Sequence, residues 1–234
     1  MILPEFKAVF VHVPKAAGQS IENFLLDELG KTRGPQGAPY LLRPNQDPDK
    51  GPKRLAHLLA GDYVKYNYMT QEQYQDWFSF SVVRNPWSRV VSFYKFRGFS
   101  SLVSFTTFVK DYLPLYFKNE FWFFRNQADF IYNDQDELLV DYLGKMEQLD
   151  SDFAYIANSL DIPFKKLPRS NTSEAKGLFS KKSARLLLKY PSILFKMSLN
   201  NEINKDYHYM YTPETLAIVN DLYARDVALL GYSY

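Results

Sequence analysis

The residues best suited to chemistry stand in two short segments, and each segment follows an apolar run. In the first, residues 6–13 lead into a short loop that carries Lys15. In the second, residues 78–83 lead into a turn that carries Arg84. An apolar strand that ends in a tight turn before a helix directs backbone N–H groups and a positive dipole end at an anion. Two such units, each with a cationic side chain, predict a ligand with phosphate groups at both ends.

The elements around these segments can be predicted from spacing. Apolar residues at every fourth position predict a helix over residues 21–29, for which Ser20 is a plausible N-cap. Asn85 and Pro86 are typical N-cap and first-turn residues of a second helix. The continuous apolar run of residues 78–83 suits the buried middle of a parallel sheet.

The rest of the chain alternates helical and strand patterns. The order of strands and helices predicts an α/β fold with a central parallel sheet flanked by helices, in three layers like those of P-loop NTPases. We expect a single domain over residues 1–234. Residues 31–53 are rich in Pro and Gly and predict a long surface loop. Further helices are expected over residues 104–113, 119–130, 150–160 and 213–230, the last between Thr212 and Gly231, and a strand over 138–143.

Composition excludes several classes of protein. The chain has 234 residues, no cysteine and a net charge of +2, from 28 basic and 26 acidic residues. A disulfide framework, thiolate metal ligands and a nucleic-acid-scale basic field are therefore absent. No stretch approaches the roughly 20 apolar residues of a membrane span, and the residues before the first strand lack the pattern of a signal peptide, so we expect none. We expect a soluble cytoplasmic protein, whereas the oligomeric state cannot be read from the sequence.

The first loop differs from that of nucleotide-hydrolysing proteins. A P-loop reads G-x-x-x-x-G-K-[ST], with the lysine directly before the hydroxyl residue. Here Lys15 precedes Gly18, the opening glycine is missing, and no acidic strand end offers itself to Mg²⁺. The loop therefore favours anion binding without a metal, which fits sulfuryl transfer. A nucleotide kinase or NTPase, and a non-catalytic nucleotide- or glycan-binding module, remain the alternatives.

Both segments resemble motifs of one enzyme family. Residues 13–20 (VPKAAGQS) resemble the 5′-phosphosulfate loop of carbohydrate sulfotransferases, whose donor is 3′-phosphoadenosine 5′-phosphosulfate (PAPS). Residues 83–94 (VRNPWSRVVSFY) resemble their 3′-phosphate motif. Residues 144–149 and 223–232 resemble segments of the same family more weakly. The chain thus resembles a soluble, bacterial-type relative of the Golgi carbohydrate and uronyl 2-O-sulfotransferases.

The resemblance implies roles for particular residues. Arg84 and Ser92 would hold the 3′-phosphate, whereas Ser88 is equally compatible with a surface role. Asn171, in the polar cluster 169–173, would contribute to a second wall around the nucleotide phosphates. The 5′-phosphosulfate would be held by Lys15, Ala16, Ala17, Gly18, Ser20 and Gln19, the last of which replaces the usual threonine of the family.

The general base is the hardest role to assign from the sequence, which has three histidines. His12 lies within the predicted first strand and suits a core position, and His208 lies in an aromatic run. His57 stands in a segment that resembles the one where uronyl 2-O-sulfotransferases place their catalytic histidine. We therefore predict Lys15 and His57 as catalytic residues, with Glu147 as the alternative base. A glycan is the expected acceptor, but a lipid, a peptide tyrosine or a small metabolite would fit the sequence equally well.

Overall fold

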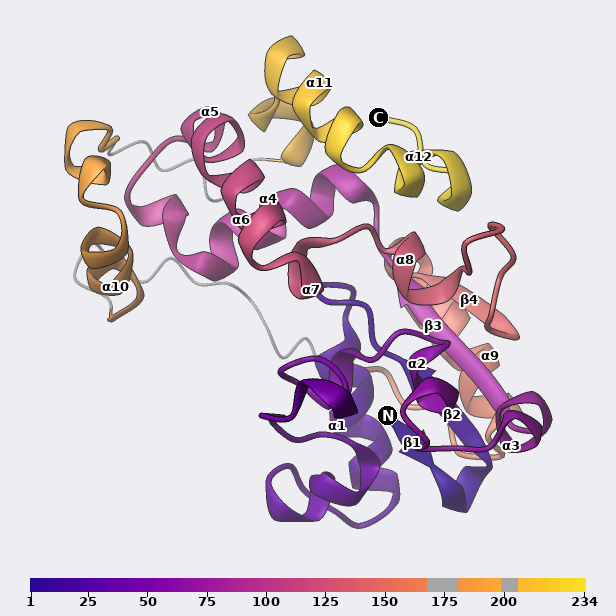
Figure 1. Cartoon of the computed structure of the whole chain (residues 1–234). Coiled ribbons are helices and arrows are strands. Elements are labelled where there is room, and N and C mark those ends of the chain that lie inside the picture. The colour runs from indigo at the N-terminus through magenta and orange to yellow at the C-terminus, as the bar shows by residue number, and fades with distance from the viewer. Residues whose placement is uncertain (168–180, 199–205) are drawn as a thin grey trace. The chain divides into compact units, whose positions relative to one another are not determined.

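The computed structural model describes residues 1–167, 181–198 and 206–234, and Figure 1 shows their ribbon. The chain divides into two compact units. The first consists of Met1–Arg84 and Arg125–Ser170, and the second of Asn85–Phe124 and Asn171–Tyr234. The division falls directly after Arg84, so residues 13–20 lie in the first unit, whereas the second predicted phosphate-binding segment, residues 83–94, is divided between the two units. Each unit is described by itself below.

The first unit contains the sheet, which has four strands in the described residues, in the order β1-β2-β3-β4. The pairings confirm the predicted α/β class, because β2–β3 and β3–β4 are both parallel and only the short β1 pairs antiparallel, with β2. Every residue of β2 is buried, as expected for a strand covered on both faces. The strands are β1 (Ile2–Leu3), β2 (Ala8–Val11), β3 (Phe78–Val83) and β4 (Tyr142–Lys145).

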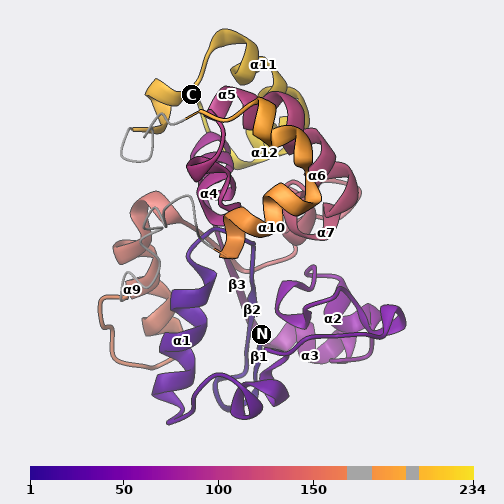
Figure 2. The same ribbon diagram turned by 90° about the vertical axis from the view of Figure 1, so that its left-hand side faces the viewer.

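Helices cover both faces of this sheet (Figure 2). Helices α1 and α9 lie on one side of the strands, and α2 and α3 lie on the other. On the first side, Phe10 and Phe80 of the sheet pack in one apolar cluster with Phe24 of α1 and Phe153 of α9. The helices of this unit are α1 (Gly18–Glu28), α2 (Asp62–Lys65), α3 (Gln71–Asp76), α8 (Ala128–Ile131) and α9 (Leu149–Ser159); its shorter turns are η1 (Pro4–Phe6), η2 (Pro35–Tyr40), η3 (Pro48–Lys50), η4 (Leu55–His57) and η7 (Met146–Gln148).

The second unit is helical in its described residues, and aromatic side chains dominate its core. Arg89 of α4 is fully buried there, 3.8 Å from the Asp226 carboxylate and over the ring of Phe93. The elements are α4 (Pro86–Arg97), α5 (Phe105–Thr107), a π-helical turn (Phe108–Tyr112), α6 (Leu113–Asn119), α7 (Phe121–Phe124), α10 (Lys181–Lys189), α11 (Pro213–Leu222) and α12 (Ala224–Leu230), with short turns η5 (Phe99–Ser101), η8 (Pro191–Phe195) and η10 (Tyr207–Met210).

Several predicted elements differ from the observed ones. The C-terminal helix predicted over residues 213–230 is two helices, because the chain breaks at Tyr223, whose hydroxyl is buried and donates to the Phe124 carbonyl. Thr212 and Gly231 do end this pair as predicted. The predicted helix over 119–130 is likewise interrupted between α7 and α8, and the strand predicted over 138–143 is shifted to Tyr142–Lys145. The element boundaries were thus wrong where tertiary contacts override local pattern.

Candidate active site

Three loops of the first unit begin at the same edge of the sheet. Because β2, β3 and β4 are parallel, their carboxyl ends meet there, and open α/β sheets bind ligands at this edge. His12 and the donor loop, residues 13–20, follow β2. Arg84 follows β3, and the turn that contains Glu147 follows β4.

The backbone of the donor loop is held in an uncommon conformation. Lys15 has φ 71° and Ala17 has φ 60°, which is the left-handed region that residues other than glycine rarely occupy. Such strain persists only where the surrounding structure enforces it, and it clusters at functional sites. Residues whose φ alternates in sign turn their N–H groups toward one concavity, which is an anion-binding geometry.

Helix α1 begins at this loop without a side-chain cap. Ala17 is the N-cap residue, and its carbonyl accepts hydrogen bonds from the N–H groups of Ser20 (2.9 Å) and Ile21 (3.3 Å). The prediction of Ser20 as N-cap was therefore wrong, since the helix begins at Gly18, three residues before the predicted start at residue 21. The N–H groups of Gly18 and Gln19 belong to the first turn of the helix, where backbone N–H groups point out of the helix end. The helix end thus directs backbone donors toward the loop, as an anion site requires.

Arg84 is fixed by a residue that the sequence analysis missed. The side-chain amide of Gln127 clamps the Arg84 peptide, because Oε1 accepts from the Arg84 N–H (2.9 Å) and Nε2 donates to the Arg84 carbonyl (2.7 Å). Gln127 is fully buried. The Arg84 guanidinium donates to the Lys15 carbonyl over 3.4 Å. The structure therefore brings Arg84 to the donor loop, and a buried glutamine after an apolar helix gave no sequence signal for this.

We predict that the Gln127 clamp matters for anion binding. Arg84→Ala should weaken binding of adenosine 3′,5′-bisphosphate by about 1.5–3 kcal/mol, the range for a lost hydrogen bond to a charged group. Gln127→Leu should weaken it too, because the N–H and carbonyl groups of Arg84 lose the side-chain amide that holds them. Calorimetric titration measures both, and Gln135→Leu, at an exposed position, is the matched control. Unchanged affinity in a folded Gln127→Leu protein would show that the clamp does not position Arg84.

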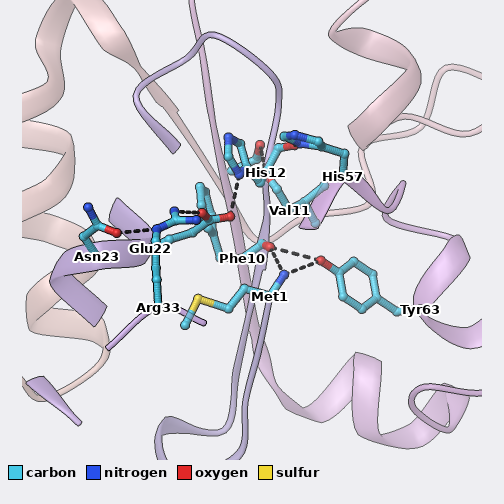
Figure 3. A network of polar contacts seen from close by, with 10 residues as sticks. Met1, Phe10, Val11, His12, Glu22, Asn23, Arg33, His57 and Tyr63 are labelled. Carbon is cyan, nitrogen blue, oxygen red and sulfur yellow. Dashed lines mark hydrogen bonds and ion pairs between the residues drawn. The ribbon is translucent and has the colours of Figure 1, made fainter. Parts of the chain in front are cut away.

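His57 lies in η4 and is buried beside the start of the donor loop (Figure 3). Its Nδ1 is 3.1 Å from the His12 carbonyl oxygen. A carbonyl can only accept, so Nδ1 carries the hydrogen and the lone pair of the neutral ring is on Nε2. Burial, with the nearby His12 ring, lowers the pKa of His57 to about 3. His57 is therefore neutral at physiological pH, with the tautomer that a base acting through Nε2 needs.

His12 belongs to a buried polar network rather than to an apolar core. Its Nδ1 is 2.5 Å from Oε1 of Glu22 on α1, and the other carboxylate oxygen of Glu22 pairs with Arg33. His12 and Arg33 outweigh burial and lower the pKa of the Glu22 carboxyl to about 2. The ring of His12 meets that of His57 edge-on, with centroids 4.4 Å apart. The prediction that His12 is a satisfied buried histidine holds, but its partners were not foreseen.

Ser88 and Ser92 lie on α4 in the second unit. Both are half-buried, and a spacing of four residues places them on one helix face. The predicted cap of this helix is confirmed, because the Asn85 side chain accepts from the Ser88 N–H over 3.0 Å and Pro86 is the first helical residue. The opposite face is buried through Val90, Phe93 and Tyr94, so the cap and the core fix the orientation of the two serines within this unit.

Three candidate residues remain: Glu147, His208 and Asn171. Glu147 lies on η7 of the first unit with its side chain exposed, in contrast to the buried His57. His208 is exposed in the second unit, where its Nδ1 is 2.8 Å from Asp206. Asn171 and the polar cluster 169–173 lie outside the described residues.

The described residues contain neither a metal-ligand cluster nor a helix that could span a membrane. Across residues 1–167, 181–198 and 206–234, no group of three or more His, Asp or Glu side chains is arranged to hold a metal ion. Within the same ranges, no helix has the length and hydrophobicity needed to cross a membrane.

Comparison with known proteins identifies the class of this chain. The model of the sulfotransferase family matches residues 1–233, which is nearly the whole sequence and includes both units. The chain therefore belongs to the sulfotransferase family, the family of the carbohydrate sulfotransferases. No curated protein and no solved structure matches it. Family membership supports sulfuryl transfer as the general activity and confirms the family predicted from the two motifs.

Proposed function

We propose that this protein transfers a sulfuryl group from PAPS to a hydroxyl group of a glycan acceptor, and that residues 1–234 form one sulfotransferase domain. The observation that carries the proposal is the donor loop at the carboxyl end of β2, where Lys15 and Ala17 adopt left-handed conformations before a helix N-terminus. Family membership supports the reaction type. The cytoplasmic location expected from the sequence stays a prediction.

In the proposed reaction, the acceptor oxygen attacks sulfur in line with the bond that breaks. A new S–O bond forms to the acceptor, and the S–O bond to the 5′-phosphate breaks, leaving adenosine 3′,5′-bisphosphate. Nε2 of His57 takes the acceptor proton. Lys15 and the N–H groups at the start of α1 stabilise the charge that develops on the departing phosphate oxygen. Arg84 and Ser92 hold the 3′-phosphate, so binding energy remote from sulfur orients the donor.

The low pKa of His57 shapes this step. It keeps Nε2 unprotonated at every physiological pH, but it also makes His57 a weaker base. A weak base is sufficient for this step, because the hydroxyl group of the acceptor becomes strongly acidic as its oxygen bonds to sulfur. Glu147, which is exposed, remains the alternative base.

Calorimetric titration followed by a transfer assay tests the proposal. We expect adenosine 3′,5′-bisphosphate to bind more tightly than ATP with Mg²⁺, because the donor loop lacks the P-loop order of lysine and hydroxyl residue. Sulfate transfer from labelled PAPS to a panel of glycans, lipids, peptides and small metabolites should be detectable, and it should persist in EDTA. Failure to bind the bisphosphate would overturn the proposal. A strict requirement for Mg²⁺ with preference for ATP would instead favour a kinase or NTPase.

A further inference from the structure

His12 makes three contacts within the first unit, and two of its partners, Glu22 and His57, are drawn beside it in Figure 3. Its Nδ1 edge faces Glu22 of α1 at 2.5 Å. Its carbonyl oxygen faces Nδ1 of His57 at 3.1 Å. Its opposite ring edge lies against Gly18, where an added Cβ would stand 2.1 Å from Cδ2 and 2.2 Å from Nε2. His12 therefore contacts the first residue of α1, the proposed base His57 and the buried carboxylate of Glu22.

The contact with Gly18 explains why the donor loop has glycine at this position. Gly18 does not have a positive φ, so its backbone conformation is open to other residues. The space beside its Cα is instead filled by the His12 ring, which allows no side chain there. The ring thus packs directly against Gly18, the first residue of α1, which belongs to the loop proposed to bind the phosphosulfate.

The ring is locked in this orientation by charge. Glu22 has a relative exposure of 1%, and a buried carboxylate is costly unless it is paired and hydrogen-bonded. Its two oxygens are used by His12 and Arg33, and Arg33 is held in turn by the Asn23 side chain at 2.5 Å. Rotation of the His12 ring would leave the Glu22 charge buried with one partner fewer. The network therefore holds the His12 ring in a single position.

We infer that His12, locked by Glu22, is a positioning residue that couples the donor loop to His57, so that the leaving-group donors and the base keep one fixed geometry. This inference rests on the proposed function, because the value of the coupling depends on His57 acting as the base. His12 itself touches no reacting atom. Its ring packs against Gly18 on one side and meets the His57 ring edge-on, with centroids 4.4 Å apart, on the other, whereas its backbone carbonyl bonds to His57 whatever its side chain.

Three charged or titratable groups influence the protonation of His57. His12 and Arg54 lower its pKa, and Glu22 raises it, while burial lowers it most. Removing the His12 ring takes away a lowering contribution and leaves the Glu22 carboxylate in place. The pKa of His57 should therefore rise toward the ordinary histidine value when His12 is replaced.

The test uses two variants of His12 and one matched control. His12→Ala removes the ring entirely. His12→Asn retains an N–H donor near the place of Nδ1, so Glu22 keeps a partner and the protein is expected to fold, but it lacks the ring edge that meets Gly18. The control is Glu28→Gln. It changes a carboxylate of α1 that pairs with Lys165 and lies outside the His12–Glu22–Arg33 network. The readouts are the Kd of adenosine 3′,5′-bisphosphate and the titration of the His57 ring followed by NMR.

Both His12 variants should bind the bisphosphate about tenfold more weakly, in line with the loss of one positioning contact. The His57 resonance, which should not titrate between pH 5 and 8 in the wild type, should titrate at a higher pH in His12→Ala than in the wild type, because a group that lowers its pKa is removed. Glu28→Gln should match the wild type in both readouts. Wild-type affinity together with an unshifted His57 in folded His12→Asn would overturn the inference, since the ring would then be only a partner for Glu22.

A double-mutant cycle tests the contact itself without relying on activity. Gly18→Ala should lower the melting temperature sharply, because the new methyl group overlaps the His12 ring. Adding His12→Ala should recover much of that loss, giving a coupling well outside additivity. Additive effects would overturn the inference. Because this cycle and the His57 titration need no substrate, they separate a failure of the coupling from a failure of the proposed sulfotransferase function, which wild-type binding and transfer assays report.

Discussion

Replacement of Lys15 by alanine is expected to lower kcat about 10²–10³-fold, the usual effect of removing one preorganised donor to a developing negative charge. The Kd of adenosine 3′,5′-bisphosphate should change much less. The reason is that the Lys15 ammonium is needed most when the bond to sulfur breaks and charge builds on the 5′-phosphate. Steady-state kinetics with saturating PAPS, compared with calorimetric titration of the bisphosphate, measures the two effects separately.

Lys7 provides the control for backbone strain. It is a lysine of the same unit, at the amino end of β2 and with a positive φ of 46°, whereas Lys15 has φ 71°. Lys7→Ala therefore places alanine in a similar left-handed conformation away from the carboxyl edge of the sheet, and its kcat should stay near the wild-type value. Equal losses of kcat in Lys7→Ala and Lys15→Ala would attribute the effect to the backbone. A larger loss of bisphosphate affinity than of kcat in Lys15→Ala would contradict the leaving-group role.

Replacement of His57 by alanine is expected to lower kcat about 10²–10⁴-fold, which is the typical contribution of a positioned general base. Nucleotide affinity should remain close to that of the wild type, because His57 contacts the His12 backbone and is not expected to bind the nucleotide. The measurement is kcat under saturating donor and acceptor, with the bisphosphate Kd as the check on the donor site.

The pH dependence of the wild-type enzyme follows from the environment of His57. A base must be neutral to accept a proton, so protonation of His57 lowers kcat. Burial lowers its pKa from 6.5 to about 3, so kcat should be flat from neutral pH down through the ordinary titration range of histidine. The acid limb should appear only near the lowered pKa, and His57→Ala should lack it. An acid limb near pH 6.5 in the wild type would contradict the buried, neutral state of His57.

Glu147→Gln is the companion variant that separates the two candidate bases. Its side chain is exposed on η7, and turnover should persist if it is only structural. An active His57→Ala enzyme beside an inactive, folded Glu147→Gln enzyme would move the role of base to the carboxylate. His57 would then be a structural histidine within the His12–Glu22 network.

Local pattern was sufficient for the elements that begin the two motifs. Buried apolar residues define β2 and β3, and the pair Asn85 and Pro86 marks the start of α4 because side-chain capping and a fixed φ are local properties. Local pattern failed at Ser20 and Tyr223. The start of α1 depends on the left-handed Ala17, and the break before α12 accompanies a buried tyrosine hydroxyl that bonds to the distant Phe124 carbonyl. Neither contact has a signature at the residue itself.

The sequence by itself determined the α/β class, the family and the positions of β2, β3 and the start of α4, because apolar periodicity, capping residues and motif spacing are properties of neighbouring residues. Only the tertiary structure decided that Gln127 clamps the Arg84 peptide, that Gly18 accommodates the His12 ring, and that His57 is neutral. These features join residues far apart in the chain, and they depend on burial, which makes an unpartnered polar group costly and lowers the pKa of a histidine. The spacing of residues in one sequence does not predict which distant side chain will hydrogen-bond to a given backbone N–H or carbonyl group.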